Sequence, residues 1–135
     1  MTGTLRAFEL GNPTPAVSIE GLGPYDRFTV GSFSGGYDVI ALFKISASGN
    51  TVRVSTRGGV SSNELTIPGS PSSPQIAHDM LYITGYGNGG KTGGTFLLEV
   101  FQIGRSGGSL SLNPIASRVG GARGEVEPTD LAVVP

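Results

Sequence analysis

The sequence predicts an all-β fold, an antiparallel β-sandwich of two sheets with jelly-roll-like connections and about eight to ten strands. Short stretches alternate apolar and polar residues between turn residues, as strands with one buried face do. No stretch keeps the roughly 3.6-residue spacing of an amphipathic helix beyond about eight residues. Glycine makes up 23 of the 135 residues and disfavours helices further. We expect residues 1–135 to form a single β domain, because this length is typical of one.

A similar seven-residue segment with Phe at its centre occurs three times, at Leu5–Gly11, Ile40–Ser46 and Leu98–Gly104. The second and third copies continue as a strand, a Ser-Gly turn and a strand over Leu42–Val54 and Val100–Leu112, which is typical of a hairpin. The copies are offset by 35 and 58 residues, whereas a solenoid or propeller keeps its period nearly fixed. The repeat therefore indicates a hairpin that is used again within a sandwich.

The first half of the chain contains four alternating stretches. Leu5–Leu10 and Ala16–Glu20 are separated by the turn residues Asn12–Pro15. Arg27–Val30 alternates after a Gly-Pro turn, and Tyr37–Ser46 is a longer strand of the same kind. Each stretch is expected to be one strand.

The middle of the chain is less regular. Thr51–Ser55 alternates with Arg53 outward, and Glu64–Ile67 is a short strand after a loop. Pro68–Pro74 holds three prolines, which cannot donate to a β-ladder, so we expect a surface linker there. Gln75–Ile83 then resumes extended structure.

The last third contains the longest apolar run, Phe96–Ile103, which has glycines close to both of its ends. It follows a glycine loop at Gly85–Gly94, and the turn Gly104–Gly108 leads out of it. The remaining expected strands are Ser109–Leu112, Ile115–Val119 and Leu131–Val134.

Alternation also predicts the core of the sandwich. One inner face is expected to carry Phe43, Ile45, Phe101 and Ile103. The facing residues are expected to be Val30, Val52, Val54, Ile67 and Ile83.

An alternative fold comes from a resemblance to a known family. Leu81–Gly87, Phe101–Leu110 and Glu127–Pro135 together resemble one blade of the lactonase-type β-propellers, over about 55 residues. The resemblance implies propeller blades and a lactonase-like β-propeller fragment. Because a propeller closes only with several blades, such a fragment would have to assemble with other chains.

Charge and hydropathy exclude two classes of partner. The net charge is −1 and charged residues make up 14% of the chain, which leaves no basic face for nucleic acid. No apolar run approaches the roughly 18 residues that span a membrane as a helix. We therefore expect neither nucleic acid nor a membrane as a partner, and the localisation stays unknown.

One segment matches a phosphate-binding motif. Gly85–Thr92 fits the pattern G-x-x-x-x-G-K-[ST] letter for letter. That loop binds phosphate where a helix begins at the Lys, because the helix N-terminus holds the anion. Here Gly93 and Gly94 follow directly, and then a β-type stretch. We therefore predict a surface loop and no cofactor.

Catalytic and metal-binding groups are not expected. His78 is the only histidine, so no multi-histidine metal site can form, and no G-x-S-x-G motif presents a serine nucleophile. Glu125 and Glu127 are interpreted as part of a surface ion-pair patch with Arg118 and Arg123. We predict that the protein is not an enzyme.

The favoured function is structural. We expect a non-enzymatic protein that assembles into an oligomer, with a trimer favoured, or onto a larger shell, such as a viral or phage capsid decoration protein at the virion surface. Its assembly contacts would come from the N-terminal strand and the C-terminal tail, at Leu5, Phe8, Leu10, Leu131 and Val133.

The alternative function is binding of a glycan or another small ligand. Its candidate site is the glycine loop, with Tyr82, Tyr86, Asn88 and Lys91. The two tyrosines would form a small stacking platform for a sugar, beside the polar groups of the loop.

Overall fold

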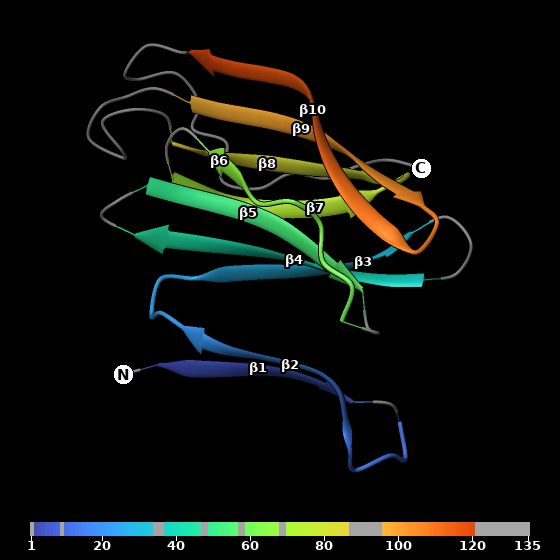
Figure 1. Ribbon diagram of the computed structural model, residues 1–135. Coiled ribbons are helices and arrows are strands. Elements are labelled where there is room, and N and C mark those ends of the chain that lie inside the picture. Colours follow the sequence, from blue (N-terminus) through green and yellow to red (C-terminus); the bar gives the residue numbers. More distant parts are fainter. Residues whose placement is uncertain are drawn as a thin grey trace.

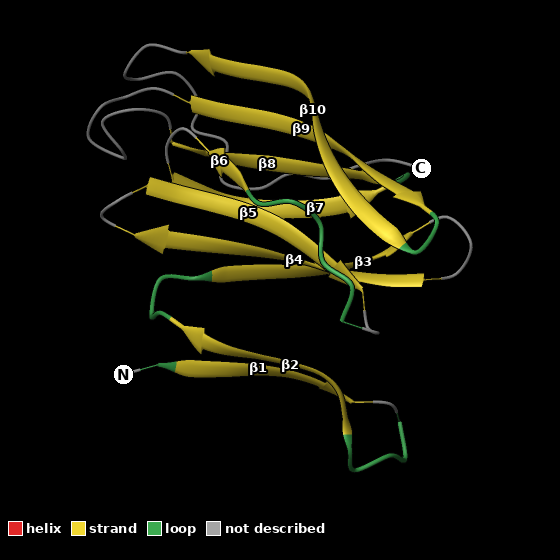
Figure 2. Cartoon of the chain, in the orientation of Figure 1, coloured by secondary structure: helices red, strands yellow, loops and turns green. Residues whose placement is uncertain are grey.

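The computed structural model describes residues 2–8, 10–33, 37–46, 49–56, 59–67, 70–86 and 96–120. Within these ranges the chain forms ten strands and no helix, which confirms the all-β prediction (Figure 2). The strands are β1 (Gly3–Phe8), β2 (Pro15–Leu22), β3 (Arg27–Phe33), β4 (Tyr37–Ser46), β5 (Gly49–Thr56), β6 (Leu65–Ile67), β7 (Ser70–Ala77), β8 (Met80–Tyr86), β9 (Phe96–Ser106) and β10 (Ser109–Gly120).

The strands form three antiparallel sheets. One four-stranded sheet has the order β3-β4-β5-β6, the other has the order β10-β9-β8-β7, and β1 and β2 form a two-stranded hairpin. Neighbours within each sheet are consecutive in sequence, so each sheet is a meander. The connections therefore differ from the jelly-roll pattern expected from the sequence, in which strands cross between sheets.

The two four-stranded sheets pack face to face as a sandwich (Figure 1). Strand β3 lies against β7 at one edge, and β5 lies against β10 toward the other. The sheets are stacked, and no propeller closure is seen in the described part of the chain. The core between them consists of Val39, Ala41, Phe43, Val52, Val54, Ile67, Leu81, Ile83, Leu97, Phe101, Ile103, Leu110 and Leu112.

A third layer covers part of the sandwich. The β1–β2 hairpin lies on the side of the β3–β6 sheet that faces away from the core, which we call the outer face (Figure 1). Val17 and Ile19 of the hairpin pack there against Ile40 and Leu42 of β4. Strand β4 is therefore buried on both faces, and residues 39–43 are all buried.

The two edges of the sandwich are held differently. At one edge the sheets approach closely, and a Cβ added to Gly31 would lie 2.4 Å from the Cβ of Ile76. Toward the other edge, the Asn63 side chain donates to the carbonyl oxygen of Leu112 (3.1 Å) and accepts from its N–H (2.9 Å). The amide side chain of Asn63 thus pairs with the backbone N–H and carbonyl of Leu112 on edge strand β10, as a neighbouring strand would.

Two expectations about the middle of the chain are wrong. Pro68–Pro74 is not a linker, because β7 begins at Ser70. Pro71 and Pro74 are tolerated in β7 because it is an edge strand of its sheet, and a register shift follows Pro71. Gln75–Ile83 is two strands joined at His78 and Asp79, and both turn residues have positive φ. The missed turn lacks the Asn-Gly signal of such hairpins.

Most of the residues predicted for the core do lie in it, but the prediction assigned several of them to the wrong sheet. Phe43 belongs to one sheet and Phe101 to the other, so they face each other across the core. Val30 pairs with Ile40 and points to the outer face, where it is exposed. Ile45 is only half-buried, near the end of β4. Arg53 points outward as predicted, since it pairs with Leu42.

Replacing Gly31 with Ala is expected to lower the free energy of unfolding by about 1–3 kcal/mol, because the added methyl must displace Ile76 where the two sheets meet. Gly3→Ala is the control, since its nearest neighbour would be 3.8 Å away. Urea unfolding measures both changes. Equal stability of the two variants would contradict the close approach of the sheets.

Replacing Phe101 with Ala is expected to cost about 3–5 kcal/mol, because the ring is central to the core and only 3% exposed. Phe28→Ala removes the same atoms from a ring that is 51% exposed, and should change the melting temperature little. A Phe101→Ala variant with the wild-type melting temperature would overturn the assigned core.

Candidate functional site

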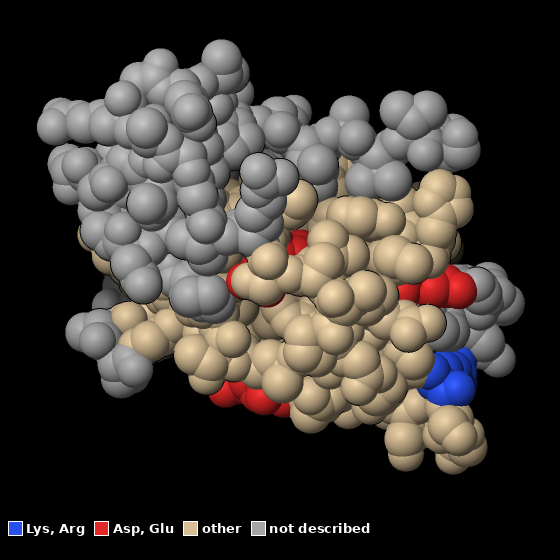
Figure 3. All heavy atoms as spheres, turned by 90° about the horizontal axis from the view of Figure 1, so that it is seen from above, with Lys and Arg blue, Asp and Glu red and all other residues tan. Residues whose placement is uncertain are grey.

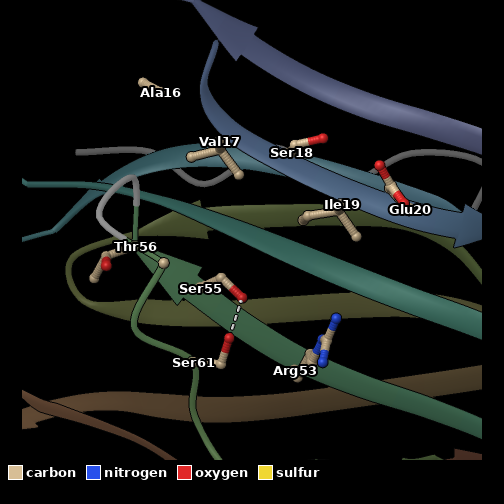
Figure 4. A pocket seen from close by; sticks show the side chains of 10 residues that line it. Ala16, Val17, Ser18, Ile19, Glu20, Arg53, Ser55, Thr56 and Ser61 are labelled. Carbon is tan, nitrogen blue, oxygen red and sulfur yellow. Dashed lines mark hydrogen bonds between the residues drawn. The ribbon is translucent and has the colours of Figure 1, made fainter.

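A cavity lies on the outer face, between hairpin strand β2 and strand β5. It encloses about 320 Å³ and is lined by Ala16–Glu20 on one side and by Arg53, Ser55, Thr56, Gly59 and Ser61 on the other (Figure 4). The two walls come from different layers. The cavity exists because a two-stranded hairpin covers only part of a four-stranded sheet.

Arg53 is the charged group of the β5 wall. Its partner across the sheet is Leu42, so it points to the outer face and rises toward β2 (Figure 4). Its Nε atom is buried and has no hydrogen-bond partner among the described residues. A buried donor without an acceptor is costly, and native structures contain few of them.

The rest of the lining is rich in hydroxyl groups. The hydroxyls of Ser55 and Ser61 lie 2.8 Å apart and hydrogen-bond to each other. The Thr56 hydroxyl accepts from the N–H of Val60 (3.2 Å), and this bond closes the short loop after β5. Glu20 belongs to the opposite wall, but its side chain is exposed on the face of β2 that is turned away from Val17 and Ile19 (Figure 4). The side chains that face the cavity therefore include one cation, Arg53, and the hydroxyls of Ser55 and Ser61.

The outer face also carries exposed apolar side chains. Phe28 and Val30 of β3 pair with Leu42 and Ile40 of β4, so they point to the same side as the residues under the hairpin. They are 51% and 57% exposed. The hairpin thus covers the apolar side chains of β4 and leaves those of β3 open to solvent.

The residues of the expected ligand loop are only partly described. Tyr82 lies on β8, half-buried, and its hydroxyl donates to the sulfur of Met80 at 3.5 Å. Tyr86 is the last residue of β8. Asn88 and Lys91, with most of the phosphate-loop match, lie outside the described residues. The structure therefore does not test that loop.

The residues expected to make assembly contacts are also only partly described. Leu5 packs against the residues between the hairpin and β4, so it is partly buried within the chain. Phe8 and Leu10 are exposed near the turn of the hairpin. Leu131 and Val133 lie outside the described residues, as do Glu125 and Glu127.

His78 and Glu99 complete the titratable groups of interest. His78 is exposed, in the two-residue turn between β7 and β8. Glu99 is buried, and its partner Ile83 belongs to the core, so its side chain points between the sheets. The Ser117 hydroxyl donates to Oε1 of Glu99. Sequence reasoning missed this buried carboxylate, although the alternation of Leu97, Glu99 and Phe101 places all three on one face.

Charge gives no further site. Figure 3 shows one side of the molecule, where most of the described surface belongs to uncharged residues. Among the described residues, no three His, Cys, Asp or Glu side chains are grouped so that they could hold a metal ion. The described ranges also contain no helix of the length and apolar character needed to cross a membrane.

Comparisons with known proteins give no relative. No protein-family model, no curated protein and no solved structure matches this chain.

Replacing Ser117 with Ala is expected to destabilise the fold by about 1.5–3 kcal/mol, because the buried Glu99 carboxylate loses its donor. Adding Glu99→Leu to that variant should restore much of the loss, since no buried polar group without a partner then remains there. Ser106→Ala, at an exposed position beside the β9–β10 turn, is the control. Chemical denaturation of the four proteins checks this. A double variant no more stable than Ser117→Ala would argue against a cost from the carboxylate.

Proposed function

We propose that this chain is a non-enzymatic structural protein that assembles with copies of itself, alone or on a larger shell, as capsid decoration proteins of viruses and phages do. The observation that supports this proposal is the incompletely covered outer face. Phe28 and Val30 are large, apolar and more than half exposed beside an apolar patch that the hairpin covers. Exposed apolar groups of this kind are typical of protein–protein contacts.

The hairpin provides a second means of contact. Among the described residues, β1 pairs only with β2 and β2 only with β1, so each has an edge without a neighbouring strand. Two-stranded sheets are marginally stable alone, and free strand edges readily pair with another chain. A second copy whose hairpin joins this one edge to edge would widen the outer layer toward the four strands of the sheet beneath it.

Low charge is compatible with self-association. The net charge of −1 opposes the approach of identical copies only weakly. Sequence reasoning favoured a trimer, whereas pairing of two identical edges gives a dimer. The mass in solution distinguishes these assemblies.

We expect sedimentation of the full chain to give a multiple of 13.8 kDa. The double substitution Phe28→Lys and Val30→Lys should reduce the mass to that of one chain, because two charges cannot be buried in an apolar contact. It should leave the melting temperature almost unchanged, since both side chains are exposed in the monomer.

Ile115→Lys is the matched control for this experiment. Ile115 is an apolar side chain with 52% exposure on β10, in the other sheet, so its substitution should preserve the assembly. A wild-type protein that stays monomeric at high concentration would contradict self-assembly. A double variant with the wild-type mass would contradict the use of the outer face.

A further inference from the structure

Among the described residues, the hairpin has two unpaired strand edges, one on β1 and one on β2. We propose that two copies of the chain pair through β1 rather than β2, antiparallel to each other, about a two-fold axis that passes beside Leu5. This inference rests on the assembly proposed above, and it identifies the strand, the symmetry and the register of that contact.

The sandwich itself offers little unpaired edge to another chain. Edge strands β3 and β7 lie against each other, where a Cβ added to Gly31 would be 2.4 Å from the Cβ of Ile76. At edge strand β10, the side chain of Asn63 pairs with the backbone of Leu112. The fourth edge strand, β6, has only three residues. Within the part of the chain that the structure describes, the hairpin is therefore the best place for strand addition, since its strands have six and eight residues.

The two hairpin edges lie on opposite sides of β4. Strand β2 lines the cavity beside β5, and no described residue of β1 does (Figure 4). Leu5 and Ala7 of β1 pack toward β4 as well, so both hairpin strands face the sheet. Because β3 and β5 flank β4, strand β1 is the hairpin strand on the side of β3.

The side chains beneath each edge favour β1 as the contact. A strand added to β2 would cover Arg53 and Ser55 of β5, and removing a cation from water is costly. A strand added to β1 would extend the outer layer over β3, where Phe28 and Val30 are more than half exposed. Burial of these two apolar side chains is favourable. The junction between two β1 strands therefore covers the apolar surface that the hairpin leaves open.

The symmetry follows from that arrangement. If both sandwiches lie on the same side of the joined layer, two identical edges can pair only antiparallel, about a two-fold axis perpendicular to the layer. The joined outer layer then has four strands, in the order β2-β1-β1-β2, and the contact closes on itself. The assembly is therefore a dimer.

The faces and the single charge of β1 select the register. Opposite residues of an antiparallel pair point to the same face, so the axis must pass beside a residue rather than between two. An axis at Thr4 or Ala7 would leave more of β1 unpaired than one nearer its middle. An axis at Arg6 would place two guanidinium groups opposite each other, which is unfavourable. An axis at Leu5 pairs Thr4 with Arg6 of the second copy and uses nearly the whole strand.

The experiment is disulfide cross-linking, because the natural chain has no cysteine and introduced ones report which residues meet. Full-length Thr4→Cys and Arg6→Cys variants are mixed, left to exchange subunits and oxidised. Both positions are exposed, so each variant should keep the wild-type melting temperature and the wild-type mass before oxidation. We expect the mixture to form a covalent dimer of twice 13.8 kDa about tenfold or more faster than either variant alone.

Matched cysteines on β2 are the control. Ala16, Ser18 and Glu20 are exposed and share the outward face of that strand. Their cysteine variants, alone and mixed in pairs, cover the registers in which two β2 strands could pair. We expect none of them to cross-link faster than chance collision allows.

Each other outcome contradicts a stated part of the inference. Rapid cross-linking of the β2 cysteines would overturn the choice of edge, and rapid cross-linking of Arg6→Cys with itself would overturn the register. A full chain that stays monomeric at high concentration would overturn this inference together with the proposed assembly. An assembly that the Phe28→Lys and Val30→Lys double variant abolishes, but in which positions 4 and 6 do not cross-link, would overturn this inference alone.

Discussion

Strand β4 is buried on both faces, and the other parts of the structure depend on that. Its inward side chains, including Phe43, pack against the second four-stranded sheet. Its outward side chains, Ile40 and Leu42, pack against the hairpin. Each fully buried side chain of this size contributes roughly 1.5–3 kcal/mol from its transfer out of water. One strand therefore joins three layers, and a polar residue anywhere within residues 39–43 would disturb at least one interface.

The fold class and several elements were predictable because they depend on local patterns. The bounds of β4 match the expected strand Tyr37–Ser46, and the β9–β10 hairpin turns at two glycines with positive φ, where glycine is favoured. The arrangement of the strands was not predictable in the same way. Alternation says which residues of one strand share a face, but not which strands share a sheet, so Phe43 and Phe101 were placed together although they lie in opposite sheets.

The sequence does contain a sign of the third layer, which a search for alternating apolar and polar residues does not detect. Val39–Phe43 is apolar at every position, which is typical of a strand covered on both sides, whereas a strand with one wet face alternates. The outward direction of the Arg53 side chain could be predicted from alternation alone. The burial of its Nε atom could not be predicted, because it depends on how the hairpin packs on β4, and these two elements are distant in sequence.

The attachment of the hairpin has a consequence for how the molecule opens. Its link to β3 is fixed by Asp26, whose carboxylate accepts from the N–H groups of Gly23 (2.9 Å) and Ile45 (3.1 Å). Beyond that anchor, an apolar contact with β4 holds the layer in place, and among the described residues no β-ladder joins the hairpin to the sheet. We therefore expect the hairpin to open as a separate unit, with amides that exchange with solvent sooner than those of β4 and β9. If the hairpin were displaced, Ile40 and Leu42 would be exposed, and the same hairpin of another copy would fit over them, as in a domain swap.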